Sequence, residues 1–274
     1  MKTTLLLAAM TGLMLLVGEA IGGRSGMTMA LAFAAAMNFA AWFWSDKIVL
    51  RSYQAQPVGL QDAPELYSIV EGLAQRAGIP MPKLYIIPDP ALNAFATGRS
   101  PSHAAVAATE GLLRTLNRDE LEGVLAHELS HVLNRDTLVS TVAATLAGAI
   151  SWLAHMAYFM PVGRDREDGP NPLVALLTML LAPFAAMLIQ FAVSRSREYG
   201  ADASGARLVG HPEGLASALR KLQQAAERIP MRKADPATAH LFIVSPLSGR
   251  SLAGLFSTHP PMEKRIERLM ASRG

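Results

Sequence analysis

Four long apolar blocks divide the chain and constrain its fold more than any other feature. They cover residues 4–21, 27–44, 138–162 and 172–193. A helix needs about 20 mostly apolar residues to cross the hydrocarbon core of a bilayer, and each block approaches or exceeds that length. Charged residues make up 17% of the chain, against roughly a quarter in soluble domains, and the deficit falls within these blocks. We therefore expect four transmembrane helices, arranged as two hairpins.

Two other structures would give similar blocks. A cleaved signal peptide could account for residues 4–21, but a second apolar run follows where a cleavage site and a folded domain should begin. The blocks at 138–162 and 172–193 could instead be buried helices of a large core. Their length relative to a membrane span favours transmembrane helices.

The stretches between the blocks are mixed in character and predict a soluble domain in two halves. The expected order is a hairpin over 1–44, the first half over 45–137, a hairpin over 138–193 and the second half over 194–274. Four spans return the chain to its starting side, so both halves should meet there. Lys47, Arg51, Arg195 and Arg197 border the second and fourth blocks, and basic flanks favour the cytoplasmic side.

Composition narrows the possible sites and partners. The chain has no cysteine, which leaves His and carboxylates as metal ligands. Its net charge is only +3 and the basic residues are scattered, so no nucleic-acid partner is expected. Apolar spacing predicts a helix over 64–77, and short apolar runs predict strands over 83–87, 93–97 and 103–109.

The sequence HELSH at residues 127–131 carries the clearest chemistry. Asn117 and Glu120 form an expected capping box, so a helix should begin there and place His127 and His131 on one face. Two imidazoles suit zinc, and Glu128 is placed to take a proton from a water bound at the metal. The pattern predicts a zinc peptidase site. A structural role for two helix histidines is the alternative.

The third ligand must come from a distant segment. Glu198 and Asp202 stand four residues apart after the last apolar block and can face the same way on a helix. Glu198 is then the candidate ligand, and Asp202 the carboxylate that holds a histidine's other N–H. The same spacing also fits two carboxylates that pair with Arg195 and Arg197 on a solvated face.

The sequence resembles HtpX-type membrane zinc metallopeptidases, which are relatives of the CAAX prenyl proteases. The resemblance covers essentially the whole chain. It rests on HELSHVLNRD at 127–136, REYGAD at 197–202, THPP at 258–261, NAFATG at 93–98 and the placement of the apolar blocks around them. It implies a mainly α-helical membrane protein with four transmembrane helices and an α+β zincin-like (gluzincin) catalytic domain that has a small β-sheet.

The resemblance also implies roles for individual residues. Zn²⁺, one ion per chain, would be held by His127, His131 and Glu198, and Asp202 would support a histidine. His259 and Arg265 match a downstream His and Arg that approach the site and stabilise the oxyanion. The segment Asn93, Ala94, Phe95 and Ala96 matches a cleft-edge strand, which would bind an extended peptide through main-chain hydrogen bonds.

The expected function is endopeptidase cleavage of membrane or membrane-associated proteins, including misfolded ones, as proteolytic quality control in a bacterial inner membrane. The chain would be multi-pass, in contact with the lipid bilayer, with its catalytic domain in the cytoplasm. A processing peptidase for lipidated tails and a non-catalytic zinc-stabilised scaffold or chaperone are the alternatives. An exposed protease site would be hazardous, so an occluding segment is expected within residues 230–257.

Overall fold

The computed structural model describes residues 2–143, 145, 195–226, 228–232, 238, 241–244 and 260–271. The predicted span at 172–193 and His259 lie outside these residues, as does most of the predicted span at 138–162. The described start of the latter is helical, within a helical run that begins at Asp136. The account below concerns the described residues.

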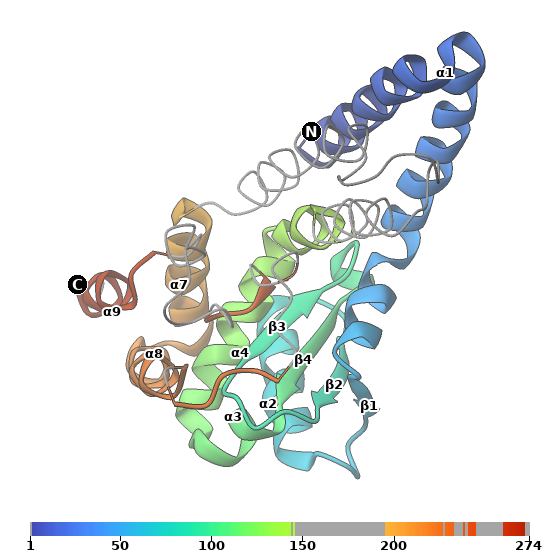
Figure 1. The fold of residues 1–274 in the computed structure, drawn as a ribbon. Helices are drawn as coiled ribbons and strands as arrows, with labels where there is room; N and C mark the ends of the chain where they lie inside the picture. Colours follow the sequence, from blue (N-terminus) through green and yellow to red (C-terminus); the bar gives the residue numbers. More distant parts are fainter. Residues whose placement is uncertain are drawn as a thin grey trace, which may run out of the picture.

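Helix α1 (Lys2–Ser52) contains the first two apolar blocks. It doubles back at Gly23, whose φ of 56° lies in the left-handed region that glycine adopts without steric cost (Figure 1). Across the turn, Asn38 Nδ2 donates to the Leu7 carbonyl at 3.3 Å and to Thr11 Oγ1 at 2.9 Å. The predicted helical hairpin is therefore present, with its two arms in contact.

The second arm of α1 is long, apolar and largely exposed. Gly23–Ser52 is the one described segment that is long and apolar enough to span a bilayer, and only 12% of its most apolar window is buried. A core helix of a soluble protein would be mostly buried. Its exposed apolar side chains are large, including Met29, Leu31, Phe33, Phe39, Trp42, Phe43 and Trp44.

A four-stranded sheet follows α1. Its order is β1-β2-β4-β3, formed by β1 (Gln56–Val58), β2 (Lys83–Ile87), β4 (Ala105–Thr109) and β3 (Ala94–Thr97). β2 and β4 are parallel, whereas β1 and β3 pair antiparallel with their neighbours, so β3 is an edge strand. The three predicted strands are confirmed, except that the second begins at Ala94 and the third at Ala105, after the short 3-10 helix Pro101–His103.

The helices pack around α4 (Arg118–Leu133), which contains the HELSH sequence. It contacts β3, α2 (Pro64–Ala77), α7 (Arg195–Val209) and α8 (Glu213–Ala226) (Figure 1). Short α3 (Glu110–Thr115) precedes α4, and α9 (Met262–Ala271) packs on α7 and α8. α2 has the predicted bounds. Because α2 and α4 both contact α7, residues 64–133 and 195–271 share one core among the described residues.

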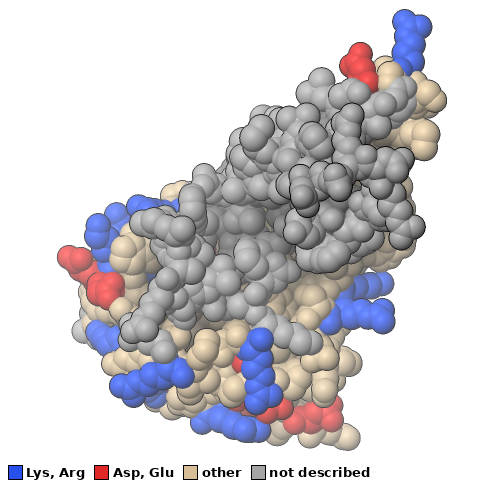
Figure 2. Space-filling model, in the orientation of Figure 1, with Lys and Arg blue, Asp and Glu red and all other residues tan. Residues whose placement is uncertain are grey.

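The two faces of the sheet bury different partners. Ala94, Ala96 and Val106 belong to the core shared with α4, whereas Phe95 and Ala107 pack with the end of α1. Alternation along β3 explains this division, because successive strand side chains point to opposite faces. Figure 2 shows charged side chains over the helices at the C-terminal end of the chain and over the sheet, and further ones at the turn of α1. Strand β3 thus connects α1 with the HELSH helix.

Candidate metal centre

Helix α4 begins with the predicted capping box. The Asn117 side chain accepts from the Glu120 N–H, and the Glu120 side chain accepts from the Asn117 N–H, both at 2.9 Å. Glu120 also binds Lys221 Nζ and Ser217 Oγ of α8 at 2.7 Å. Burial alone would raise the pKa of Glu120, but these hydrogen bonds lower it overall. The start of the helix is thereby tied to α8.

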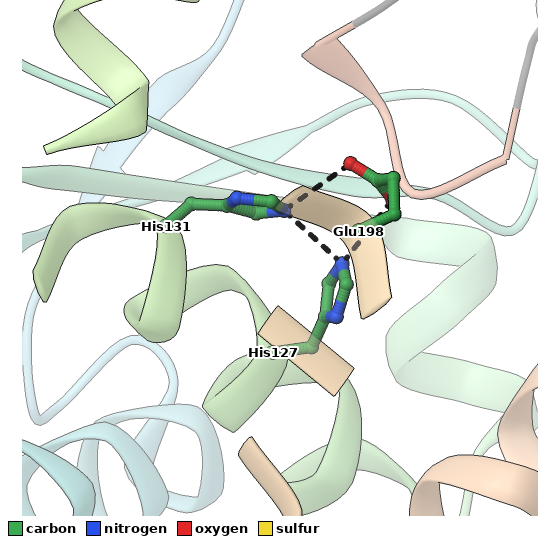
Figure 3. A group of neighbouring side chains, drawn as sticks. All are labelled: His127, His131 and Glu198. Carbon is green, nitrogen blue, oxygen red and sulfur yellow. Dashed lines mark hydrogen bonds and ion pairs between the residues drawn. The ribbon is translucent and has the colours of Figure 1, made fainter. Parts of the chain in front are cut away.

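His127, His131 and Glu198 converge from α4 and α7 (Figure 3). The two histidine Nε2 atoms lie 3.3 Å apart, and the Glu198 carboxylate lies 3.8 Å from His127 Nε2 and 3.5 Å from His131 Nε2. Two nitrogens that bind one tetrahedral zinc at 2.0–2.1 Å should lie roughly 3.3 Å apart. The donor set and its spacing therefore fit zinc.

Asp202 and Arg265 support the His127 side of this group. His127 Nδ1 lies 2.9 Å from Asp202 Oδ1, which leaves Nε2 facing His131 and Glu198. Arg265 of α9 donates to both Asp202 oxygens, at 2.9 Å from Nε and 2.7 Å from Nη2. Although burial opposes ionisation, Arg265 lowers the pKa of Asp202 overall. This carboxylate is therefore held as an anion that fixes the histidine ring.

His131 has a looser set of partners. Its Nδ1 lies 3.4 Å from Asp136 Oδ2, and Asp136 Oδ1 lies 3.5 Å from Arg197 Nη1. Asp136 reaches back because Arg135, after the end of α4, has a φ of 58°. A non-glycine residue seldom adopts this left-handed conformation, and such positions cluster at functional sites.

Close packing of α7 on α4 brings Glu198 and Asp202 to the histidines. At Gly205, an added Cβ would lie 2.9 Å from the His127 backbone nitrogen and 3.1 Å from the Ala126 carbonyl carbon. Only glycine allows the two backbones this approach. The absence of a side chain at Gly205 is thus a condition of the site's geometry.

Glu128 is oriented by strand β3. Its Oε2 accepts a hydrogen bond of 2.9 Å from the Ala96 N–H. Burial raises the pKa of Glu128 to about 8 in the metal-free site, despite the opposing effect of nearby His131. A bound divalent cation would favour the ionised carboxylate. Glu128 is therefore placed as a general base beside the three candidate ligands.

The pKa values of the two histidines are shifted in opposite directions. Burial lowers the pKa of His127, and Asp202 only partly opposes this, so the ring is neutral as a metal ligand requires. Burial would also lower the pKa of His131, but the hydrogen bond to Asp136 and the charges of Glu198 and Glu128 raise it overall.

A small pocket with a cavity volume of about 30 Å³, partly open to solvent, lies over this group. Its lining includes His127, Glu128, His131, Glu198 and Ala96. Residues 241–243 complete the lining. The segment 241–244 follows the outer edge of β3, where the Ile243 N–H donates to the Ala94 carbonyl at 3.2 Å. The Asn93 side chain holds the same segment through the Val244 carbonyl at 2.8 Å. This segment falls within the range expected to be occluding.

The structure sorts the predicted site residues into three groups. His127, Glu128, His131, Glu198 and Asp202 come together as expected. Arg265 is fully buried and does not line the pocket, but its Nη2 lies 3.3 Å from His127 Nε2 and its Nη1 lies 3.6 Å from Glu198 Oε2.

The predicted substrate strand, Asn93 to Ala96, is at the site, yet all four residues are buried. Its outer edge contacts the 241–244 segment and Glu128 instead of lying open.

Sequence reasoning missed two contacts. Asp136 stood only in a family motif, Arg197 was considered as a basic flank and as a surface partner of Glu198 and Asp202, and no spacing within one helix could show that Asp136 and Arg197 meet. The contact of the Ala96 backbone with Glu128 leaves no signal in side-chain types. Such contacts depend on tertiary packing.

The chain matches one family of known proteins over most of its length. The sequence model of Peptidase family M48 matches residues 60–273. The "Protease HtpX homolog" of Desulfatibacillum aliphaticivorans is 57% identical over 277 residues, which cover 99% of this chain and 89% of that protein. The "Protease HtpX homolog" of Thermococcus kodakarensis is 54% identical over 273 residues, covering 98% and 94%.

A solved structure shares the fold. The crystal structure of S. mikatae Ste24p superposes with a TM-score of 0.55 at 21% identity, covering 98% of this chain and 64% of that chain. At this identity the likeness supports the fold alone.

Proposed function

The chain belongs to peptidase family M48, and from this premise we propose that His127, His131 and Glu198 hold the zinc ion at which it hydrolyses peptide bonds. As an HtpX-type member it is a zinc-dependent membrane endopeptidase. The observation that carries the assignment of ligands is the convergence of two histidines and a carboxylate from two helices, beside a buried Glu128. A structural zinc site has no need of a base beside the ligands.

The residues around the three ligands have different proposed roles in hydrolysis. Zinc, when bound, polarises a peptide carbonyl and lowers the pKa of water to about 7. Glu128, aligned by the Ala96 N–H, takes a proton from the attacking water and passes it to the departing amine. Asp202 holds His127 in the tautomer that presents Nε2, and Arg265 holds Asp202. His259, outside the described residues, is the proposed stabiliser of the oxyanion.

Membrane and membrane-associated proteins are the proposed substrates, including misfolded ones removed as quality control. The exposed apolar second arm of α1 supports a site close to a bilayer, since Val49 and Leu50 at the end of α1 pack in one cluster with Phe95 of β3. We propose four transmembrane helices in a bacterial inner membrane with the catalytic domain in the cytoplasm. A reporter fused after Gly274 should then be active in the cytoplasm, and a periplasmic result would reverse the orientation.

A cleavage assay tests the proposed mechanism. The full chain in detergent should cleave a loosely folded protein such as casein only with zinc bound. Glu128→Gln should retain one zinc per chain but lose activity by about 10²–10⁴-fold, the usual contribution of a general base. Glu71→Gln, an exposed site on α2, is the matched control.

Two outcomes would count against this account. Cleavage by Glu128→Gln at the wild-type rate would remove Glu128 from the mechanism. Cleavage of a prenylated peptide but of no plain counterpart would favour a specific processing peptidase.

A further inference from the structure

We propose that Asp136 and Arg197 are positioning residues that hold His131 for zinc binding and link it to both ends of the apolar stretch between them. The inference rests on the proposed function and deepens it. In this proposal Asp136 and Arg197 orient His131 in the way that Asp202 and Arg265 orient His127. Each ligand histidine is then backed by an aspartate, and each aspartate by an arginine.

The contacts follow one order on both sides of the metal group. On the His131 side, Nδ1 faces Asp136 at 3.4 Å and Asp136 faces Arg197 at 3.5 Å. On the His127 side, Nδ1 faces Asp202 at 2.9 Å and Asp202 faces Arg265 at 2.7 Å. In both cases the carboxylate occupies Nδ1 and leaves Nε2 for the metal. Partners of this kind fix the ring orientation of a ligand histidine.

Arg197 is suited to hold Asp136 because its charge is poorly solvated. Its side chain is 13% exposed, and that of Asp136 is 15% exposed. Among the described residues, both terminal nitrogens of Arg197 are buried without a hydrogen-bond partner, and Asp136 supplies its ion pair. An unpaired charge in a poorly solvated place is costly, so the Arg197 guanidinium holds the Asp136 side chain close to it.

The pair lies at the two ends of the second apolar region. Asp136 begins the helical run 136–143, just after the left-handed turn at Arg135, and Arg197 stands in the first turn of α7. The sequence between them contains the predicted spans at 138–162 and 172–193. A shift of either chain end would therefore move Asp136 or Arg197 and, through them, His131.

Zinc affinity tests the positioning role directly. The full chain in detergent, stripped of metal, is titrated with zinc against a competing chelator. Asp136→Ala should weaken zinc binding by about 10–100-fold, the usual effect of losing a ligand's hydrogen-bond partner. Asp202→Ala should weaken it more, because its contact with His127 is shorter. Arg195→Ala, exposed on the same helix as Arg197, should leave affinity unchanged.

A double-mutant cycle separates support through Asp136 from a general charge effect. Arg197→Ala should weaken zinc binding in the wild type. It should have little further effect in the Asp136→Ala background, because Arg197 then has no carboxylate to hold. Arg197→Lys should restore part of the affinity. Equal and independent losses in the two backgrounds would overturn the proposal.

If Asp136→Ala does not fold, a second variant, Asp136→Asn, can be tested by the absorption spectrum of bound Co²⁺. Asp136→Asn has nearly the same shape and should fold, as judged by circular dichroism. With Co²⁺ in place of zinc, its visible absorption bands should shift relative to wild type, because His131 is less firmly oriented. Wild-type zinc affinity and an unchanged cobalt spectrum would overturn the proposal. A wild-type protein that binds no zinc would instead overturn the proposed function.

Discussion

The two helices that supply the metal ligands are built in opposite ways. Helix α4 buries 11 of its 16 residues and begins with a complete capping box. Helix α7 buries 4 of its 15 residues, and two of those four are Glu198 and Asp202 themselves. One helix is a core element that also carries ligands, whereas the other is held largely by the residues of the site. The position of His127 and His131 is therefore fixed by the core, whereas the position of Glu198 depends on the contacts of the site itself.

This difference predicts where the site is vulnerable. Contacts at Arg265 and Gly205 place α7, so changes there should affect stability and zinc binding together. Changes at the start of α4 should affect stability alone. Zinc should also protect α7 from local opening more than it protects α4, because binding stabilises the state that holds all three ligands.

Removal of Arg265 should have the largest effect on stability. Arg265→Ala leaves the buried Asp202 without its partner, and breaking a buried pair in this way costs about 3–5 kcal/mol. Urea unfolding of the metal-free protein, followed by circular dichroism, measures the change. Lys264→Ala, exposed on the same helix, is the control. Equal stability of the two variants would show that Arg265 does not hold α7.

A methyl group at Gly205 should separate the helices. Gly205→Ala places its Cβ against the backbone of α4, and overpacking of this kind costs about 1–3 kcal/mol. Gly200→Ala on the same helix meets no atom within 4 Å, and replacing helical glycine should stabilise by roughly 0.5–1 kcal/mol. The same unfolding assay should give opposite signs. A stabilised Gly205→Ala protein would contradict the close approach.

A smaller, pH-dependent effect should mark the start of α4. The pKa of Glu120 is lowered in the folded state, so its stabilisation is present above the unfolded value of 4.5 and is lost as pH falls through the folded value. Glu120→Gln should cost about 1–2 kcal/mol at pH 7, from weaker bonds to Lys221 and Ser217. The gap from wild type should shrink below pH 4.5. A gap that stays constant with pH would exclude this ionised role, and zinc affinity at pH 7 should be unchanged.

The contrast between α4 and α7 also explains which features could be predicted from the sequence. The bounds of α2 and β2, the capping box at Asn117 and the facing of His127 and His131 depend on residues close in sequence, and all are confirmed. The position of Glu198 relative to α4 depends on Gly205 and on α9, so spacing alone left its role open. The burial of Asn93–Ala96 under residues 241–244 requires contacts across about 150 positions, as between Asn93 and Val244.

Zinc stoichiometry and affinity of three proteins test the central claim that both helices complete one metal centre. Wild type, Glu128→Gln and Glu198→Ala are compared in the same detergent with a competing chelator. Glu128→Gln should bind one zinc with wild-type affinity, while Glu198→Ala should lose more than the roughly 100-fold expected for a supporting residue. Undiminished zinc binding by Glu198→Ala would contradict the account, because α7 would then supply no ligand.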